Sequence, residues 1–238
     1  MNETSTLNAE QLAENIAHVR NQITHAAEKV GRDPAEVILV AVSKMKPVEL
    51  VEMAYNLGVR DFGENRVQEA LLKIASFHPQ EMHWHLIGHL QSNKASKVVE
   101  PFASVQSVDS LHLAQILHRH AEEHGKRLPI LLQINVAGES TKEGMSIEET
   151  FNLAREIATL SALRIEGLMT VAPLVENPEE VRPVFRALYQ LRERLKNEVT
   201  VSDWRHLSMG MTDDYQVAIE EGATIVRVGR AIFGRRPN

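Results

Sequence analysis

Residues 37–47 read VILVAVSKMKP, a run of six aliphatic residues followed by a polar end with two lysines and a proline. A run this apolar on both faces predicts a strand that is covered on both sides, as the strands of parallel sheets are. Alternate side chains of a strand share a face, so Lys44 points to the same side as Val40 and Val42. The stretch therefore predicts an amine at the carboxyl end of a buried parallel strand.

Lys44 is the unusual residue of this stretch. An ammonium in an apolar interior has a lowered pKa, and an amine that loses its proton attacks aldehydes to form a Schiff base. Lys46 competes for this role, although Pro47 holds it in extended backbone at the start of a loop, where solvated lysines are common. Two interpretations of Lys44 stay open at this point: a Schiff-base lysine, or a strand-end lysine whose side chain reaches solvent.

The composition fits one large domain. The chain has 238 residues, 43% of them hydrophobic, so we expect residues 1–238 to form a single domain. A net charge of -6 and the lack of a long basic run argue against nucleic acid or an anionic membrane as the main partner. The chain has no cysteine, no stretch of membrane-spanning length and no export signal, so we expect a cytoplasmic protein.

An amphipathic helix is predicted before the first strand. From Leu12 to Val30, apolar residues recur at steps of three and four, as they do on one face of a helix. We expect this leader helix to cover residues 8–30 and to end at Gly31. Residues 1–7 precede it, and we expect them to be flexible.

Strand and helix patterns alternate through the rest of the chain, without a linker rich in glycine or proline. Eight strands in such alternation predict a closed (β/α)8 TIM barrel, with the leader helix as an addition. An open doubly wound sheet is the alternative, but no G-x-G-x-x-G or G-x-x-x-x-G-K-[ST] motif follows a strand. The predicted strands are 37–42, 61–65, 82–88, 103–108, 129–136, 163–171, 204–209 and 224–229, and the predicted helices are 47–57, 66–76, 92–100 (with Ser92 as N-cap), 110–123, 146–160 (with Ser146 as N-cap), 178–197 and 214–221.

The ends of the predicted strands form a candidate site, because in a barrel they meet on one rim. The loops after strands seven and eight of such barrels commonly bind phosphate through backbone N–H groups, and here residues 208–210 and 229–230 form small-residue turns at those places. Arg227 shares a face with Ile225 and points inward, where a guanidinium needs a partner. The rim predicted in this way consists of Lys44, Glu64, Asn65, His85, Ile87, Gly88, Asn135, Met169, Ser208, Met209, Gly210, Arg227 and Gly229.

Three other groups of polar residues have simpler explanations. His83 and His85 share a strand face, but no third ligand is placed near them, and we expect no metal site. Asp213 and Asp214 stand at the start of a helix, where carboxylates favour the helix dipole, so capping explains them better than catalysis. The loop after the fifth strand carries Lys142, which belongs either to a flap over the site or to a solvated surface.

The chain resembles the pyridoxal phosphate homeostasis proteins, a single-domain family related to the N-terminal barrel of alanine racemase. The resemblance covers nearly the whole chain in the family's order. It implies an alanine racemase N-terminal domain-like barrel that binds pyridoxal 5'-phosphate (PLP). The matching segments are AVSKMKP (41–47), FGENRVQE (62–69), WHLIGHLQSNK (84–94), EGLMT (166–170), LSMGMTDDY (207–215) and VRVGRAIFG (226–234).

The resemblance implies roles for residues on the rim. Lys44 is implied to carry PLP as an aldimine, Asn65 to lie beside the pyridine ring, and Arg227 to meet the ring nitrogen. Ser208 and residues 229–230 are implied to hold the phosphate. The full expected cofactor-binding set is Lys44, Asn65, His85, Met169, Ser208, Met209, Arg227, Gly229 and Arg230.

Two arginines bear on the expected chemistry. Arg230 stands where many relatives have threonine, so a hydroxyl contact to phosphate is lost and its backbone N–H remains as a donor. A pyridine nitrogen beside Arg227 remains unprotonated, because arginine only donates, and the ring then withdraws electrons weakly. This disfavours transaminase chemistry and leaves carrying, transimination or racemase-type proton transfer.

Three hypotheses for function follow. The first is a protein that carries PLP for vitamin B6 homeostasis and passes it to apo-enzymes. Related racemases take an acid or base from a second domain and a dimer partner, and this chain ends soon after the eighth strand, so we expect no efficient catalysis. The resemblance also implies a monomer, and no exposed apolar stripe argues otherwise. The second is an enzyme, either a PLP-dependent amino-acid racemase of low activity or a class I aldolase that uses Lys44 without cofactor. The third is a regulatory module that acts through contacts with other proteins.

Overall fold

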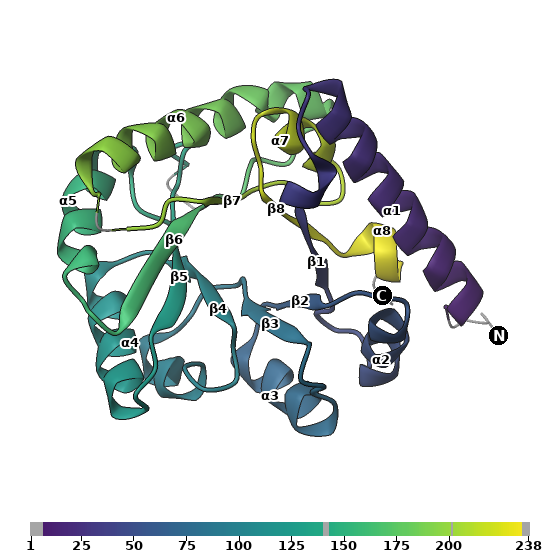
Figure 1. Ribbon diagram of the computed structural model, residues 1–238, viewed down its shortest axis with the longest axis horizontal. Helices are drawn as coiled ribbons and strands as arrows, with labels where there is room; N and C mark the ends of the chain where they lie inside the picture. Colours follow the sequence, from purple (N-terminus) through teal and green to yellow (C-terminus); the bar gives the residue numbers. More distant parts are fainter. Residues whose placement is uncertain (1–6, 140–142, 201, 235–238) are drawn as a thin grey trace.

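The computed structural model describes residues 7–139, 143–200 and 202–234. Its eight strands run parallel and close into a barrel in chain order, as the sequence predicted (Figure 1). The open doubly wound alternative is therefore excluded. The prediction of flexibility for residues 1–7 lies outside the described residues, except at Leu7. The strands are β1 (Ile38–Val42), β2 (Asp61–Glu64), β3 (His83–Leu86), β4 (Ser104–Val108), β5 (Leu128–Gln133), β6 (Leu163–Met169), β7 (His206–Ser208) and β8 (Ile225–Val228).

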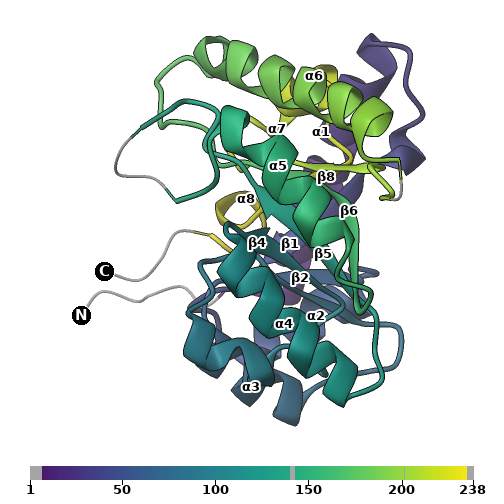
Figure 2. The same ribbon diagram turned by 90° about the vertical axis from the view of Figure 1, so that its left-hand side faces the viewer.

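Helices surround the barrel. In Figure 2, four of them (α3, α4, α5 and α6) follow one another along one side of the molecule. The α-helices are α1 (Ala9–Lys29), α2 (Val48–Asn56), α3 (Val67–Ser76), α4 (Leu111–Glu123), α5 (Ile147–Ala158), α6 (Arg182–Glu198), α7 (Tyr215–Glu220) and α8 (Arg230–Phe233), and the 3-10 helices are η1 (Pro34–Glu36), η2 (Ser92–Lys97) and η3 (Pro178–Val181).

The helix ends test the predicted caps. Ser146 caps α5 and accepts a hydrogen bond from the Glu149 N–H, while the Glu149 side chain returns a bond to Ser146, so the predicted cap is a full capping box. The short helix predicted over residues 92–100 is present as the 3-10 helix η2, but its N-cap is Gln91, so the predicted cap at Ser92 was wrong by one residue.

The strands bury both faces, which explains their continuous apolar sequences. One face packs against the helices, and Ala41, Phe62 and Trp84 are fully buried there. The other face fills the barrel with a small cluster made only of strand residues, which includes Val40 of β1 and Met169 of β6. The predicted alternation along β1 is confirmed, since Val40 lies inside and Ala41 outside.

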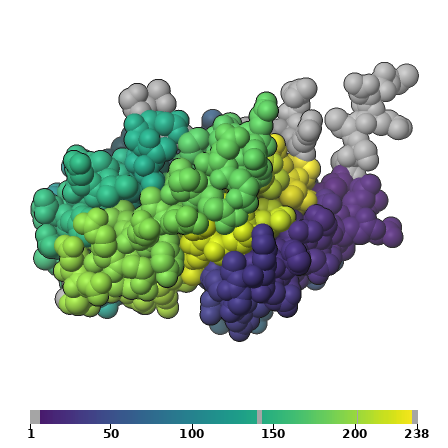
Figure 3. All heavy atoms as spheres, turned by 90° about the horizontal axis from the view of Figure 1, so that it is seen from above, coloured from purple at the N-terminus to yellow at the C-terminus, as the bar shows by residue number. Residues whose placement is uncertain are grey.

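The leader helix α1 lies along the C-terminal part of the chain. The Asn15 side chain donates to the Ile232 carbonyl of α8 at 2.9 Å, and just beyond the helix Arg32 donates to the carbonyls of Ile219 and Ala223. In Figure 3 the C-terminal residues (yellow) lie between the purple N-terminal helix and the green residues of the second half. The added helix therefore joins the two ends of the chain and supports the last strand of the barrel.

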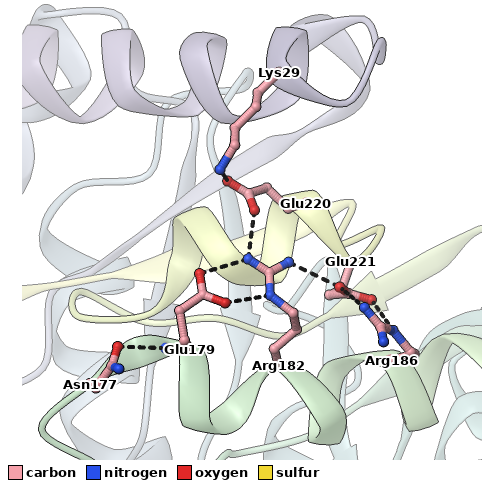
Figure 4. Close-up of polar contacts among 7 residues, drawn as sticks. All are labelled: Lys29, Asn177, Glu179, Arg182, Arg186, Glu220 and Glu221. Atoms are coloured by element: carbon pink, nitrogen blue, oxygen red, sulfur yellow. Dashed lines mark hydrogen bonds and ion pairs between the residues drawn. The ribbon is translucent and has the colours of Figure 1, made fainter.

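Ion pairs join α1, α6 and α7 at one end of the barrel (Figure 4). The Arg182 guanidinium contacts Glu179, Glu220 and Glu221, at distances of 2.6 to 3.0 Å. Lys29 of α1 contacts Glu220 at 2.6 Å. Because α7 leads into the start of β8, this network lies at the opposite end of the barrel from the rim where the site is predicted.

Among the described residues, no helix is both long and apolar enough to cross a membrane.

Candidate functional site

Lys44 lies in the turn that follows β1, two residues beyond the last residue of the strand. A backbone hydrogen bond of 3.0 Å from the Lys46 N–H to the Ser43 carbonyl closes this turn. Met45 has φ +60°, a left-handed conformation that costs free energy for a residue with a side chain. Lys44 itself is partly buried, between a fully buried serine and an exposed methionine.

Lys46 has a structural contact at the C-terminus of the described chain. Its Nζ donates to the Phe233 carbonyl at 2.8 Å and to the Gly234 carbonyl at 3.2 Å, where α8 ends. These carbonyls have no partner within the helix, and a lysine that binds them is a common way to satisfy such an end. Lys46 therefore has a structural role at the end of α8.

Arg227 of β8 points into the barrel, as its strand position predicted. It is buried, and its guanidinium donates to the Ser208 hydroxyl at 2.7 Å and to the Thr170 carbonyl at 2.8 Å. Burial lowers the pKa of Arg227 to about 10, and the negative charge of Asp214 acts in the opposite direction. Arg227 therefore still carries its charge near neutral pH and can only donate hydrogen bonds.

Ser208 connects Arg227 to a third strand. Its hydroxyl donates its single proton to Oε1 of Gln106 at 2.6 Å and accepts from Arg227 on the other side. The Gln106 amide nitrogen is buried and has no hydrogen-bond partner. The structure brings Ser208 and Arg227 together, as predicted, but the Ser208 proton is used inside the barrel.

The backbone N–H groups at the rim differ in how they are used. The Met209 N–H donates to the Ile225 carbonyl at 3.1 Å, and the Met211 N–H donates to the Asp214 carboxylate at 2.6 Å. Gly229 and Arg230 instead begin α8, where the first N–H groups of a helix have no carbonyl partner within it. Of the predicted phosphate-binding turns, the one after β8 is therefore the better placed to donate.

Gly229 brings the turn after β8 close to the end of β1. A Cβ added at Gly229 would lie 3.2 Å from the Val42 carbonyl oxygen and 3.3 Å from the Val42 Cβ. β1 and β8 are paired along their length, with Val40 opposite Arg227. Lys44, which follows Val42 by two residues, and the start of α8 are thus neighbours on the rim.

Asn65 follows β2 on the same rim and is partly buried. Gly88, from the loop after β3, packs directly on its backbone: a Cβ at Gly88 would lie 2.5 Å from the Asn65 carbonyl oxygen. Only a glycine allows this approach, since real Cβ atoms do not come so close to an oxygen. Gly88 therefore helps to fix the position of Asn65.

The side chain of Arg230 turns away from the site to Asp213. The two form an exposed ion pair that joins the loop after β7 to the start of α8. Asp214, the residue at the N-cap of α7, makes no side-chain cap and instead accepts from the Met211 N–H. The interpretation of this acidic pair as helix caps is therefore wrong, because both carboxylates hold the loops after β7 and β8.

Three residues of the expected cofactor-binding set have side chains that pack within the barrel or its wall. The ring of His85 contacts Asp61 at 2.9 Å and Ser104 at 2.8 Å, and these two residues begin β2 and β4. Met169 packs in the inner cluster and is 1% exposed, while Met209 packs on the outer face under the helices. The contacts of His85 and the outward packing of Met209 argue against contacts of these two side chains with a ligand at the rim. Met169, in contrast, is the last residue of β6 and lies inside the barrel beside Ser208.

Contacts with the His85 ring also favour the ionised form of the Asp61 carboxyl. Burial alone would raise the pKa of Asp61, but hydrogen bonds and charge from His85 and His83 outweigh it, and the pKa is lowered.

The described residues hold no group of three potential ligands that could bind a metal ion. The possible role of Lys142 in a flap lies outside the described residues.

Sequence reasoning missed a buried ion network behind the Lys44 turn. Nζ of Lys73, on α3, contacts the Glu64 carboxylate at 2.6 Å, the Glu69 carboxylate at 2.8 Å and the Ser43 carbonyl at 2.7 Å. The Ser43 hydroxyl donates to the same oxygen of Glu64 at 2.7 Å. Burial raises the pKa of Glu64 more than Lys73 and Ser43 lower it. The one available signal was a lysine on the apolar face of a helix.

Comparisons with known proteins identify the family of this chain. The chain matches the family described as alanine racemase, N-terminal domain, over residues 7–237. A pyridoxal phosphate homeostasis protein from Pseudomonas aeruginosa is 45% identical over 225 residues, which are 94% of this chain and 96% of that protein. The chain belongs to the pyridoxal phosphate homeostasis protein family. The family member from Aquifex aeolicus is 40% identical over 223 residues, 94% of this chain and 97% of that protein.

Solved structures place the family among its neighbours. PipY from Synechococcus elongatus, in its structure with PLP bound, is 38% identical and superposes with a TM-score of 0.84 over 94% of this chain and all of that chain. Alanine racemase from Clostridium difficile superposes with a TM-score of 0.72 at 18% identity, over 94% of this chain and 58% of that chain. The family therefore shares the barrel fold of alanine racemase.

Proposed function

We propose that this member of the family binds PLP at the rim formed by β1 and β8 and holds it covalently through the amine of Lys44. The aldehyde of PLP is the group that reacts with an amine, and its phosphate is the group that the start of a helix binds. We also propose that residues 1–238 act as one PLP-binding domain and serve intracellular PLP homeostasis.

The observation that carries this proposal is the proximity of Gly229 to the end of β1. A ligand with a phosphate at one end and an aldehyde at the other needs an N–H cradle and an amine on the same rim. A Cβ added at Gly229 would lie only 3.2 Å from the Val42 carbonyl oxygen, which supports that arrangement, and Lys44 lies in the next turn. The relative with PLP in its structure, at 38% identity, supports it independently.

The residues around the cradle fit a PLP site with divided tasks. Gly229 and Arg230 would bind the phosphate through their N–H groups, and the Arg230–Asp213 ion pair would hold the two loops in place. Asn65 would orient the ring from the other side of Lys44. Ser208 would act through Arg227, whose position it fixes at 2.7 Å, instead of donating its own proton to phosphate.

Arg227 limits the chemistry that this site would support. PLP bound to a protein withdraws electrons most strongly when its ring nitrogen is protonated, and a guanidinium that only donates does not favour that state. Such a site would hold and release PLP more readily than it would stabilise a carbanion. We therefore propose a carrier without efficient catalysis, a cytoplasmic monomer whose recipients are apo-enzymes that need PLP. Alanine racemisation at a rate on the order of 1 per second or faster would contradict the carrier assignment.

A PLP titration of three proteins tests the proposal. In the natural chain, addition of PLP should produce an absorbance band at roughly 420 nm that persists after removal of free PLP. Lys44→Ala should lose the band and keep its fold by circular dichroism. Lys46→Ala is the matched control, since it removes an amine two residues away that binds the end of α8, and it should keep the band. Loss of the band in Lys46→Ala alone would contradict the assignment of Lys44.

A further inference from the structure

We propose that Lys73, with Glu64 and Glu69, is a positioning residue for Lys44: this buried ion network holds the turn on both sides of Lys44 and so sets the reactivity of its amine toward aldehydes. The inference rests on the proposed function for the identity of the aldehyde as PLP. Its structural part concerns the Lys44 amine alone.

Lys73 reaches the turn from the helix that packs on the outside of the barrel wall. Its side chain is 8% exposed, and its Nζ makes three contacts of 2.6 to 2.8 Å, one with each of Glu64, Glu69 and the Ser43 carbonyl. An ammonium has three protons, so all of them are used. A fully bonded ammonium in a fixed position is a rigid point of attachment, because any shift of the turn breaks a charge-assisted bond.

The residue before Lys44 is held at two atoms. The Ser43 carbonyl accepts from Lys73, and the Ser43 hydroxyl donates to Oε1 of Glu64 at 2.7 Å. Ser43 and Glu64 are both 0% exposed. Ser43 points out of the barrel toward α3, on the face of β1 opposite to that of Val40. The network therefore holds the outer face of β1 at its carboxyl end, directly before Lys44.

The residue after Lys44 is held by the same network. The Met45 N–H donates to Oε1 of Glu69, the oxygen that also accepts from Lys73. Met45 has φ +60°, and a side-chain-bearing residue keeps such a conformation only where its surroundings impose it. The bond from Met45 to Glu69 is a direct cause for that conformation. With Ser43 and Met45 both fixed, Lys44 has a fixed starting point for its side chain.

Burial of this ion network costs free energy, and a contribution to stability does not explain it. Buried ion pairs contribute little to folding compared with apolar residues of the same size, because desolvation offsets the Coulomb attraction. In this network the contacts of Glu64 offset only part of the cost of burying its carboxylate. Its Oε2 atom is buried without a hydrogen-bond partner, and burial raises the pKa of Glu64. A buried network that lowers stability and strains Met45 is expected where a reactive side chain, here Lys44, must be positioned to a fraction of an ångström.

Aldehyde labelling of the protein without PLP separates this inference from the proposed function. Formaldehyde with cyanoborohydride methylates each lysine through an imine, and mass spectrometry gives the rate at every lysine as a function of pH. We expect Lys73→Met to lower the rate at Lys44 by about tenfold, or to shift the pH midpoint of that rate, and to leave Lys46 unchanged. The matched control is Lys196→Met, which removes a lysine paired with Glu193 on the surface of α6 and should change nothing at Lys44.

Two further variants keep the test decisive if Lys73→Met is unfolded by circular dichroism. Glu69→Ala removes the acceptor of the Met45 N–H at a partly exposed site, and Lys73→Arg keeps the buried charge. We expect Glu69→Ala to change the rate at Lys44 and Lys73→Arg to recover part of the loss. Folded variants whose Lys44 rates and pH profiles equal those of the natural chain would overturn the inference. A natural chain that fails to bind PLP, with Lys44 rates that still depend on Lys73, would overturn the proposed function alone.

Discussion

The Arg227 guanidinium donates a 2.7 Å hydrogen bond to the Ser208 hydroxyl inside the barrel, and Ser208 donates in turn to Gln106. Three strands, β4, β7 and β8, are joined by this chain of side chains. The proposed site places the charge of Arg227 near the ring of PLP. This polar chain lies directly beside the apolar inner cluster, since Arg227 is paired with Val40.

We expect Arg227→Leu to lower the free energy of unfolding by about 2–4 kcal/mol, because the Thr170 carbonyl and the Ser208 hydroxyl lose a buried charged donor. Urea unfolding measures the change. Arg186→Leu is the control, since its exposed pair with Glu221 should contribute far less to stability than the buried contacts of Arg227. Equal losses in the two variants would show that the buried contacts of Arg227 add nothing.

We expect His85→Ala to cost about 2–3 kcal/mol of stability, because it removes the ring that links Asp61 to Ser104 and leaves a cavity in the barrel. Its dissociation constant for PLP should stay within about twofold of that of the natural chain, since distant sites act independently. Asn65→Ala is the comparison and should weaken PLP binding by about tenfold, the effect of one lost hydrogen bond. A larger effect on PLP from His85→Ala than from Asn65→Ala would restore His85 to the site.

We expect Gly88→Ala to weaken PLP binding by about tenfold or more, because the new Cβ would lie 2.5 Å from the Asn65 carbonyl and displace that residue. The measurement is a PLP titration of folded protein. Gly125→Ala provides a control, with φ +59° and no atom within 4 Å of the added Cβ. It should cost about 1 kcal/mol of stability through the backbone alone and bind PLP normally.

The network around Arg182 should make stability depend on pH in the acid range. A hydrogen bond from Arg182 lowers the pKa of Glu179, one from Arg186 lowers that of Glu221, and in Glu220 contacts with Lys29 and Arg182 outweigh burial. A carboxylate with a lowered folded-state pKa stabilises the fold fully above its ordinary value, 4.5 here, and loses that contribution as the pH falls through the folded value.

Urea unfolding between about pH 7 and pH 3 tests this dependence. Arg182→Gln should flatten the acid side of the profile, and added salt should have the same effect on the natural chain, because exposed pairs are screened. An identical acid profile for Arg182→Gln would mean that these pairs do not stabilise the fold.

The barrel and the place of Lys44 could be predicted because each rests on a local pattern. Six aliphatic residues in a row required a strand covered on both faces, and alternation from Val40 placed the following lysine on the rim. The same alternation, applied to the eighth strand, predicted that Arg227 points into the barrel. The capping box of Ser146 and Glu149 was readable because both residues belong to one turn of helix.

The parts that could not be predicted depend on contacts between distant segments. Lys73 resembles any lysine on a helix, and only packing brings its Nζ to Glu64 and Ser43. His85 was assigned to the rim because the sequence does not show that Asp61 and Ser104 would hold its ring at the strand starts. The acidic pair after β7 resembled helix caps because the partner of Asp213, Arg230, comes 17 residues later.

The central claim, that Lys44 is the amine that holds PLP, is tested most directly by locating the bond. Borohydride reduction of the PLP-loaded protein fixes the cofactor to its lysine, and cleavage after glutamate gives a peptide from Val37 to Glu49 that contains both Lys44 and Lys46. Fragmentation of this peptide by mass spectrometry should place the added mass on Lys44. Added mass on Lys46, or on any peptide outside residues 37–49, would contradict the account.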